Sequence, residues 1–258
     1  MNFRYLSIIL LVVIGNQTNA KSIRTCSTNS PKTTQSKKSP VVKPKYQDSK
    51  VNPVQAHTPK KFNFTTIQGL SLSQLEQHYK LYNGYATKWN EIEQSLLTVD
   101  RSNVANITYS PFRALKIAQT FALNGTILHE LYFGNLASNK SKPGPQTLAL
   151  LTENWGSLEN FKTDLMACAS CSRGWVVTSY QILDGKAYNY VLDAHNETVP
   201  LLALPILIVD IYEHAYTIDF GIQRAEYLKV LWQTINWDAV EERMLQWVNK
   251  FKVYNTDK

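Results

Sequence analysis

Cysteine is scarce in this sequence, with three residues among 258: Cys26, Cys168 and Cys171. An odd number leaves at least one thiol unpaired or available to another molecule. Three cysteines in a chain of this length exclude a small protein whose fold is stabilised mainly by disulfides. Cys168 and Cys171 form one Cys-x-x-Cys pair, and no second pair stands at the spacing of a zinc site. The sequence therefore favours incidental or structural thiols over zinc binding or redox chemistry.

The apolar run near the start of the chain, residues 6–14, is too short to span a bilayer comfortably. It follows Arg4 and leads to Ala20, the pattern of a secretory signal that is cut after a small residue. We expect residues 1–20 to be a signal peptide and the protein to be exported, to a periplasm or to the extracellular space. An uncleaved anchor is the alternative. A lipid anchor is disfavoured because Arg24 and Thr25 precede Cys26.

Residues 21–61 contain too little apolar surface to fold. Lys, Ser, Thr and Pro dominate this stretch, a composition that predicts a disordered arm. The arm has ten Lys or Arg and one Asp, so it carries +9, whereas residues 62–258 carry −3. Such an arm would contact an anionic envelope surface weakly, with no specific nucleic-acid target. A solvated spacer is the other interpretation.

From residue 62 onward, apolar residues recur with helical spacing. Ser73-x-x-Glu76 resembles a capping box and precedes an amphipathic pattern of about 25 residues. A second helix is predicted from Ser110 and Pro111 to Gly134, because proline is favoured at the first helical position. Further helices are predicted over residues 146–155 and 158–166. The first two helices define a predicted helical hairpin domain, residues 62–140.

The pattern then changes to that of strands. Residues 175–182 and 187–192 are rich in β-branched and aromatic side chains, and Asp184-Gly185 between them predicts a hairpin. A third apolar run, residues 206–211, is followed by a helical pattern over residues 225–253. We therefore predict an α+β protein, in which the helical hairpin precedes a mixed domain, residues 141–258, with a three-stranded antiparallel sheet and flanking helices.

Asp210 and His214 lie four residues apart where the third strand is predicted to end. A carboxylate and an imidazole are both ordinary metal ligands, so the two residues could serve one ion. The pair alone is weak evidence. Asp210 could equally accept hydrogen bonds in a turn, and His214 could pack in the core.

Several longer motifs strengthen the metal interpretation. They are DIYEHAY (210–216), the downstream pattern Arg224-x-x-Tyr227-Leu228-x-x-x-Trp232-x-x-x-Asn236-Trp237, FALNGTILHELYFGNL (121–136), WGSLENFK (155–162), RGW (173–175), EQHY (76–79) and YATKWN (85–90). In this order they resemble the iron/manganese superoxide dismutases, over residues 62–254. The resemblance implies one iron or manganese ion per chain, bound by His78, His129, Asp210 and His214.

The same resemblance implies a function. Members of that family convert superoxide to oxygen and hydrogen peroxide by ping-pong redox cycling of the metal. It also implies a homodimer, because Glu213 of one subunit would reach the equivalent of His214 in the other. Which of the two metals is used cannot be read from the ligands, which both metals share.

The resemblance assigns catalytic roles to Tyr85, His195 and Tyr82. Tyr85 would gate the substrate, and His195 would take the place of an outer residue that touches the metal-bound solvent, with Gly125 leaving room for it. Tyr82 stands where relatives carry a second gating residue, a histidine. Tyr212 and Thr217 also depart from the family pattern, so activity could be reduced.

Two other functions compete with this one. The first is a non-enzymatic, envelope-binding or interaction protein that retains the superoxide dismutase fold and adheres through its cationic arm. The second is another non-haem iron enzyme, which would normally use two histidines and one carboxylate and leave positions open. Four predicted protein ligands argue against the second.

Overall fold

The computed structural model describes residues 55–65, 67–102, 104–137 and 141–251. The predicted signal peptide and most of the predicted arm lie outside these residues. The described elements are α1 (Leu72–Thr98), α2 (Pro111–Gly134), α3 (Pro145–Trp155), α4 (Leu158–Cys171), β1 (Trp175–Gln181), β2 (Lys186–Leu192), β3 (Ala203–Asp210), a 3-10 turn (Glu213–Ala215), α5 (Thr217–Phe220), α6 (Arg224–Thr234) and α7 (Trp237–Phe251). Helices precede a small antiparallel sheet and helices follow it, so the predicted α+β fold is confirmed.

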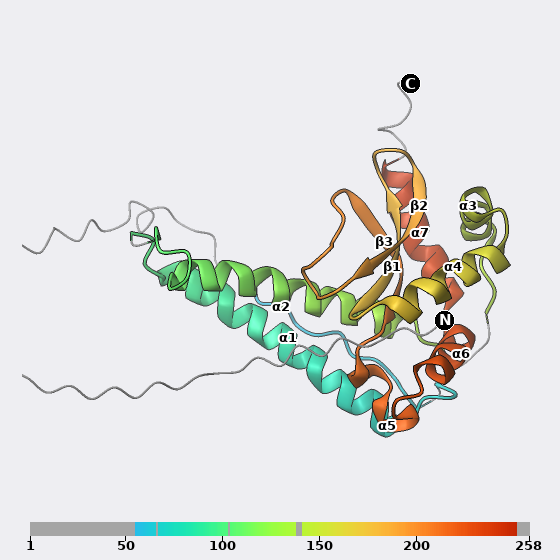
Figure 1. Ribbon diagram of the computed structural model, residues 1–258, viewed down its shortest axis with the longest axis horizontal. Coiled ribbons are helices and arrows are strands. Elements are labelled where there is room, and N and C mark those ends of the chain that lie inside the picture. Colours follow the sequence, from blue (N-terminus) through green and yellow to red (C-terminus); the bar gives the residue numbers. More distant parts are fainter. Residues whose placement is uncertain (1–54, 66, 103, 138–140, 252–258) are drawn as a thin grey trace, which may run out of the picture. The chain divides into compact units, whose positions relative to one another are not determined.

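Two long helices, α1 and α2, run alongside one another and form the helical hairpin (Figure 1). Helix α2 begins at Pro111, as predicted, and the Ser110 hydroxyl accepts a hydrogen bond from the Arg113 amide. Helix α1 begins two residues earlier than the predicted box. Ser71, and not Ser73, is its N-cap, and its hydroxyl accepts from the Gln74 amide at 3.0 Å. The spacing Ser71-x-x-Gln74 fits a capping box as well as the predicted one.

The sheet has the strand order β2-β1-β3, with both pairs antiparallel. The predicted hairpin between β1 and β2 is present, and Gly185 adopts a φ of 72° there, which suits glycine. Strand β1 is buried along nearly its whole length because it is the central strand. Helix α2 packs against β3, and α4 packs against β1 and β2 (Figure 1). The sheet therefore connects the helical hairpin to the C-terminal helices.

Two helical predictions change. Helix α4 continues to Cys171, five residues beyond the predicted end. The predicted C-terminal helical region is two helices, α6 and α7, separated at Ile235 and Asn236. The chain breaks there because Ile235 pairs with Leu136 in an isolated β-bridge and the Asn236 amide donates to the Asn135 carbonyl at 2.7 Å. These long-range bonds leave no clear signal in the local sequence.

Residues 55–61, which the sequence assigned to the arm, lie against helix α1, and we call them the N-terminal strap. The amide and carbonyl of His57 both bond to the Asn90 side chain, at 2.8 and 2.9 Å. The Lys60 amide donates to the Tyr82 hydroxyl, and the Lys60 carbonyl accepts from the Tyr79 hydroxyl. The strap is thus part of the packed structure, although it contains no helix or strand.

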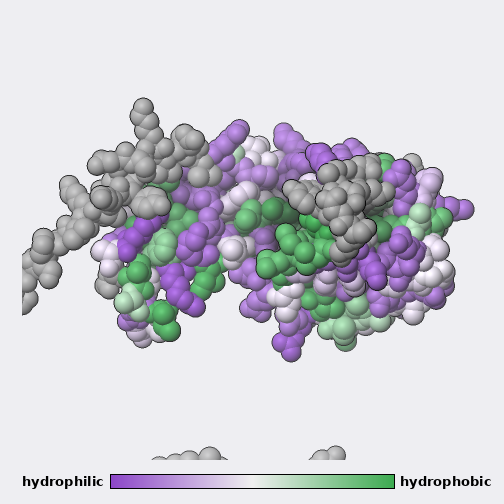
Figure 2. All heavy atoms as spheres, turned by 90° about the horizontal axis from the view of Figure 1, so that it is seen from above, coloured by the Kyte–Doolittle hydropathy of each residue, from purple (hydrophilic) through white to green (hydrophobic). Residues whose placement is uncertain are grey.

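Among the described residues, no helix has the length and apolar character needed to cross a membrane. On the face shown in Figure 2, separate hydrophobic patches lie among hydrophilic residues. The predicted secretory signal lies outside the residues to which this finding applies.

Candidate metal centre

Four residues from separate parts of the fold meet at one point. His78 projects from α1, His129 from α2, Asp210 from the end of β3, and His214 from the 3-10 turn that follows. Their ligand atoms all lie within 4.8 Å of one another. His78, His129 and Asp210 are fully buried, and the side chain of His214 is 25% exposed. The structure therefore brings together the complete ligand set implied by the sequence.

Asp210 lies at the middle of this cluster. Its Oδ2 atom is 3.0 Å from Nε2 of His78, 3.2 Å from Nε2 of His214 and 3.7 Å from Nε2 of His129. Its other oxygen, Oδ1, accepts from the Tyr212 amide at 2.9 Å, which fixes the orientation of the carboxylate. Ligand atoms bound about 2.0–2.2 Å from one ion would lie about 3 Å apart, close to the spacings found here.

His129 shows that the cluster suits a cation. Its Nδ1 lies 2.6 Å from the carbonyl oxygen of Gly125 and can only donate to it. In the neutral ring, Nε2 is then the unprotonated nitrogen, and this buried atom has no hydrogen-bond partner among the described residues. An orphaned lone pair is costly in a protein interior. A metal ion in the cluster would satisfy it.

The charges of the cluster depend on one another. Burial acts to raise the pKa of Asp210, but the charges and hydrogen bonds of His214 and His78 outweigh it, so the pKa falls well below its usual range. Burial lowers the pKa of His129 to about 3, with His78 adding to the effect. The ionised Asp210 and the neutral His129 are in the protonation states that bind a metal. His214 differs, because Asp210 outweighs the effect of burial and raises its pKa, so a bound metal would have to displace its proton.

His195 is buried beside the ligands and is not a surface turn residue. Its Nδ1 accepts a hydrogen bond from Nε1 of Trp175 at 2.9 Å, and Trp175 also packs edge-on against His129. Burial lowers the pKa of His195 to about 4. The ring is therefore neutral near pH 7, and Nε2 carries the proton because Nδ1 is an acceptor.

Tyr85 lies next to His195. Its ring stacks on His129 with centroids 5.2 Å apart, and it meets the ring of His195 edge-on at 4.7 Å. A Cβ atom on Gly125 would come within 2.9 Å of Tyr85 and 3.2 Å of His195. Glycine at position 125 therefore provides the space that both rings occupy, as the sequence predicted for His195.

Tyr82 lies on another side of α1. Its hydroxyl donates to Glu130 Oε2 at 2.9 Å and accepts from the Lys60 amide at 2.8 Å. Lys60 Nζ also lies 2.7 Å from Glu130 Oε1. Tyr82 is completely buried in this network and makes no ring contact with the four ligands. The structure gives it a role in packing the N-terminal strap, and its predicted catalytic role gains no support from this position.

Three supporting residues were absent from the sequence prediction of the site. Gln74 donates from Nε2 to the His214 carbonyl at 2.6 Å and accepts from the Ile218 amide. Tyr227 donates from its hydroxyl to the Asp210 carbonyl at 2.8 Å, and Asn124 donates to the His195 carbonyl at 2.9 Å. Gln74 stands one helical turn before His78, which is the one local signal that could have identified it.

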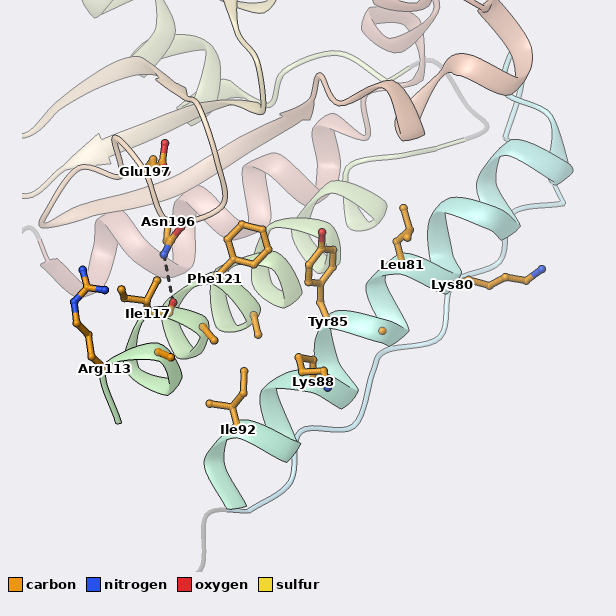
Figure 3. A pocket seen from close by; sticks show the side chains of 14 residues that line it. Lys80, Leu81, Tyr85, Lys88, Ile92, Arg113, Ile117, Phe121, Asn196 and Glu197 are labelled. Atoms are coloured by element: carbon orange, nitrogen blue, oxygen red, sulfur yellow. Dashed lines mark hydrogen bonds between the residues drawn. The ribbon is translucent and has the colours of Figure 1, made fainter. Parts of the chain in front are cut away.

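A groove of about 850 Å³ runs between α1 and α2 and reaches Tyr85 (Figure 3). Its lining is mostly apolar and includes Leu81, Ile117 and Phe121. Figure 3 shows Arg113 at one end and Lys80 at the other, with Lys88 between them. The groove thus combines a mostly apolar lining with three cationic side chains and one carboxylate, that of Glu197, and it reaches Tyr85 beside the ligands.

Fold and site together define a class of protein: an α+β protein with a buried cluster of three histidines and one aspartate that could hold one metal ion. Residues 143–243 match the family model described as iron/manganese superoxide dismutases, C-terminal domain. The chain belongs to the iron/manganese superoxide dismutase family.

Curated relatives support this assignment. The chain is 38% identical over 182 residues to the protein named superoxide dismutase [Fe] of Aquifex aeolicus, covering 69% of this chain and 85% of that one. The protein of the same name from Aquifex pyrophilus gives the same values. The protein named superoxide dismutase [Mn] of Mycolicibacterium smegmatis is 33% identical over 126 residues, covering 48% of this chain and 61% of that one. Similarity thus extends to relatives named for either metal.

The positions that depart from the family pattern lie close to the site. The ring of Tyr212 stacks on His214 with centroids 5.1 Å apart and lies 5.3 Å from the ring of His195. Thr217 donates from its hydroxyl to the Glu213 carbonyl. Glu213 is exposed. Tyr212 therefore lies against two rings of the site. The predicted contact of Glu213 with a second subunit stays a prediction.

Proposed function

We propose that this protein is a superoxide dismutase, converting superoxide to oxygen and hydrogen peroxide at one iron or manganese ion. The observation that carries the proposal is the convergence of His78, His129, Asp210 and His214 within 4.8 Å in a chain of this family. When bound, such an ion supplies one-electron chemistry by alternating between its trivalent and divalent states. The reaction would follow the ping-pong order, in which one superoxide is oxidised and a second is reduced.

The chain's own residues would attract the anionic substrate to the metal. Three neutral imidazoles and one carboxylate leave net positive charge at a bound trivalent ion, which favours an anionic substrate. Lys80, Lys88 and Arg113 add positive charge along the groove that reaches Tyr85. Two carboxylates partly offset this charge, because Lys88 pairs with Glu91 and Glu197 also lines the groove.

His195 and Tyr85 would supply protons for the formation of hydrogen peroxide. Forming hydrogen peroxide requires two protons, and both groups keep a proton on an atom near the ligands at neutral pH. His195 carries it on Nε2, while burial, with a further contribution from Asp210, raises the pKa of the Tyr85 hydroxyl. Trp175 holds the ring of His195 in place through its bond to Nδ1. Each of these two groups would thus be able to donate a hydrogen bond to a superoxide ion that enters beside the ligands.

A direct test is to measure metal content and superoxide dismutation on the same purified sample. The proposal predicts about one iron or manganese ion per chain and dismutation that disappears when the metal is removed. Reloading the chain separately with iron and with manganese, and comparing the activities, would identify the working metal. Full metal occupancy with negligible dismutation would instead favour the non-enzymatic binding protein.

Export and dimer formation remain part of the proposal. Residues 1–20 would direct the chain out of the cytoplasm, and sequencing the N-terminus of the native protein would detect cleavage near Ala20. A homodimer through Glu213 and His214 would bring two centres close together, and sedimentation of wild type and Glu213→Ala would test this arrangement.

A further inference from the structure

Two thiols occupy the last turn of α4, outside the metal centre. Both are free; Cys168 is half-buried and Cys171 is exposed. Residues three apart in a helix lie on the same side, with Cβ atoms about 5–6 Å apart. A disulfide requires Cβ atoms about 3.5–4.5 Å apart. The two cysteines could therefore be joined if the turn tightened by roughly 1–2 Å.

The last turn of α4 is well placed to tighten. Cys171 is its final residue, and Ser172, the C-cap, already has extended backbone angles of φ −73° and ψ 150°. The Cys168 carbonyl accepts from the Ser172 amide at 2.9 Å and from the Cys171 thiol at 3.3 Å. The Cys171 thiol thus points back along the helix to the Cys168 carbonyl. Closing the bond would require the backbone at Cys171, the final residue of the helix, to shift between its two hydrogen-bonded neighbours.

Although the sequence alone favours incidental or structural thiols, the geometry of this turn leads us to a different assignment: we propose that Cys168 and Cys171 form a dithiol that hydrogen peroxide oxidises to an intrahelical disulfide. Peroxide as the local oxidant rests on the proposed function, which produces it, whereas the reactivity of the thiols does not. The exposed Cys171 is the thiol that peroxide reaches first. Cys168 is the resolving thiol, since burial and the nearby Asp164 raise the pKa of its thiol and disfavour it as the initial nucleophile.

The reaction balances in two steps. The Cys171 thiolate attacks one peroxide oxygen, the O–O bond breaks, and hydroxide leaves while Cys171 becomes a sulfenic acid. The Cys168 thiolate then attacks the Cys171 sulfur, the S–S bond forms, and the S–O bond breaks with loss of a second hydroxide. The two hydroxides take up the two thiol protons. Two thiols and one peroxide thus give one disulfide and two waters, and sulfur supplies both electrons.

The surroundings hold the backbone next to this pair. Arg224 donates from Nη1 to the carbonyls of Ser172, at 3.0 Å, and Ser170, at 3.4 Å. The Ser172 hydroxyl donates to the Trp175 carbonyl at 2.9 Å. These bonds anchor the chain on both sides of Cys171. Oxidation should therefore leave β1 and the metal centre in place.

Mass spectrometry can test the proposal, because one tryptic peptide contains both cysteines. Cleavage after Lys162 and Arg173 releases residues 163–173, and cleavage after Arg24 and Lys32 separates Cys26 in residues 25–32. Purified full-length protein is reduced, treated with an equimolar amount of hydrogen peroxide, alkylated and digested. We expect peptide 163–173 to lose two hydrogens and its alkylation to fall at least tenfold. Added peroxide makes this result independent of whether the chain dismutates superoxide.

Three variants sharpen the test. Cys26→Ser should leave the disulfide in peptide 163–173 unchanged. Cys168→Ser should stop at a sulfenic acid on Cys171 that dimedone traps, and Cys171→Ser should slow the loss of the remaining helical thiol at least tenfold. A disulfide between peptides 25–32 and 163–173 would overturn the proposal. So would a crosslink between two chains, or a wild-type Cys171 that is trapped by dimedone and never forms a disulfide.

Discussion

Two tyrosines on helix α1, three residues apart, have opposite surroundings. Tyr85 lies against His129 and His195 at the metal centre, whereas Tyr82 bonds to Glu130 and to the N-terminal strap. At about 100° per residue, Tyr85 is turned about 20° from the direction of His78, and Tyr82 about 40° the other way. The two side chains thus differ by about 60° in direction around the axis of α1. Tyr85 faces the metal centre, and Tyr82 faces the N-terminal strap.

The largest effect should come from removing a ligand on the metal-facing side. His129→Ala deletes a buried nitrogen from the cluster, so we expect loss of the bound metal and at least a roughly 100-fold fall in dismutation. Metal analysis and an activity assay on one sample would check both. His57→Ala is the matched control, because it removes an imidazole from the strap, and it should keep the metal. Retention of a full metal complement by His129→Ala would contradict the ligand assignment.

Acid should destabilise the metal-free protein, because buried histidines on the metal-facing side stay neutral in the folded state. The pKa of His129 falls to about 3 and that of His195 to about 4 in the folded state, both below the ordinary value of 6.5, chiefly because of burial. Between about pH 6.5 and pH 4 the unfolded chain therefore binds more protons than the folded one. Stability is fully present above this window and is lost as the pH falls through it, by about 1.4 kcal/mol per pH unit for each histidine.

Urea unfolding of the metal-free protein at several pH values would measure this slope. His78 should add to the slope, because burial also lowers its pKa. His214 and Asp210 should contribute little within the window, since the pKa of His214 is raised and that of Asp210 is lowered. His195→Gln should reduce the slope by the contribution of one histidine, about 1.4 kcal/mol per pH unit. A free energy of unfolding that stays constant from pH 6.5 to pH 4.5 would show that these rings are not held neutral.

Tyr85→Phe should separate catalysis from metal binding. The ring would keep its packing on His129, while the hydroxyl proton beside the centre would be lost, so we expect full metal content with dismutation reduced about tenfold. Rapid mixing with superoxide, together with metal analysis, would check this result. Unchanged turnover would remove Tyr85 from the proposed mechanism.

Tyr82→Phe should give the smallest effect, and on stability alone. It removes a buried hydroxyl that bonds to Glu130 and to the Lys60 amide, which should cost about 1–3 kcal/mol of unfolding free energy. Metal content and turnover should match wild type within a factor of two or so. Urea unfolding and the activity assay would be run beside Tyr85→Phe. A loss of turnover equal to that of Tyr85→Phe would restore Tyr82 as a catalytic candidate.

Much of the site could be predicted because its motifs are local. The aspartate and histidine of DIYEHAY and the histidine of FALNGTILHEL stand in contiguous strings, and helical geometry placed Tyr85 on the side of His78. The same geometry could not place Tyr82, whose orientation depends on Glu130 and Lys60, residues far away in sequence. Gln74 and Tyr227 were not assigned to the site, although Gln74 stands one turn before His78 and Tyr227 belongs to one of the motifs, because each bonds to the backbone carbonyl of a residue that is distant in sequence.

The sequence by itself indicated the order of most helices and strands, and its motifs, through their resemblance to a known family, indicated that family and four candidate ligands, because periodicity and motifs are properties of neighbouring residues. Only the tertiary structure decided that the ligand atoms meet, that Nε2 of His129 is an orphaned acceptor, and that residues 55–61 pack on α1. Each of these depends on contacts between residues distant along the chain. Packing selects such contacts among many that the local sequence permits.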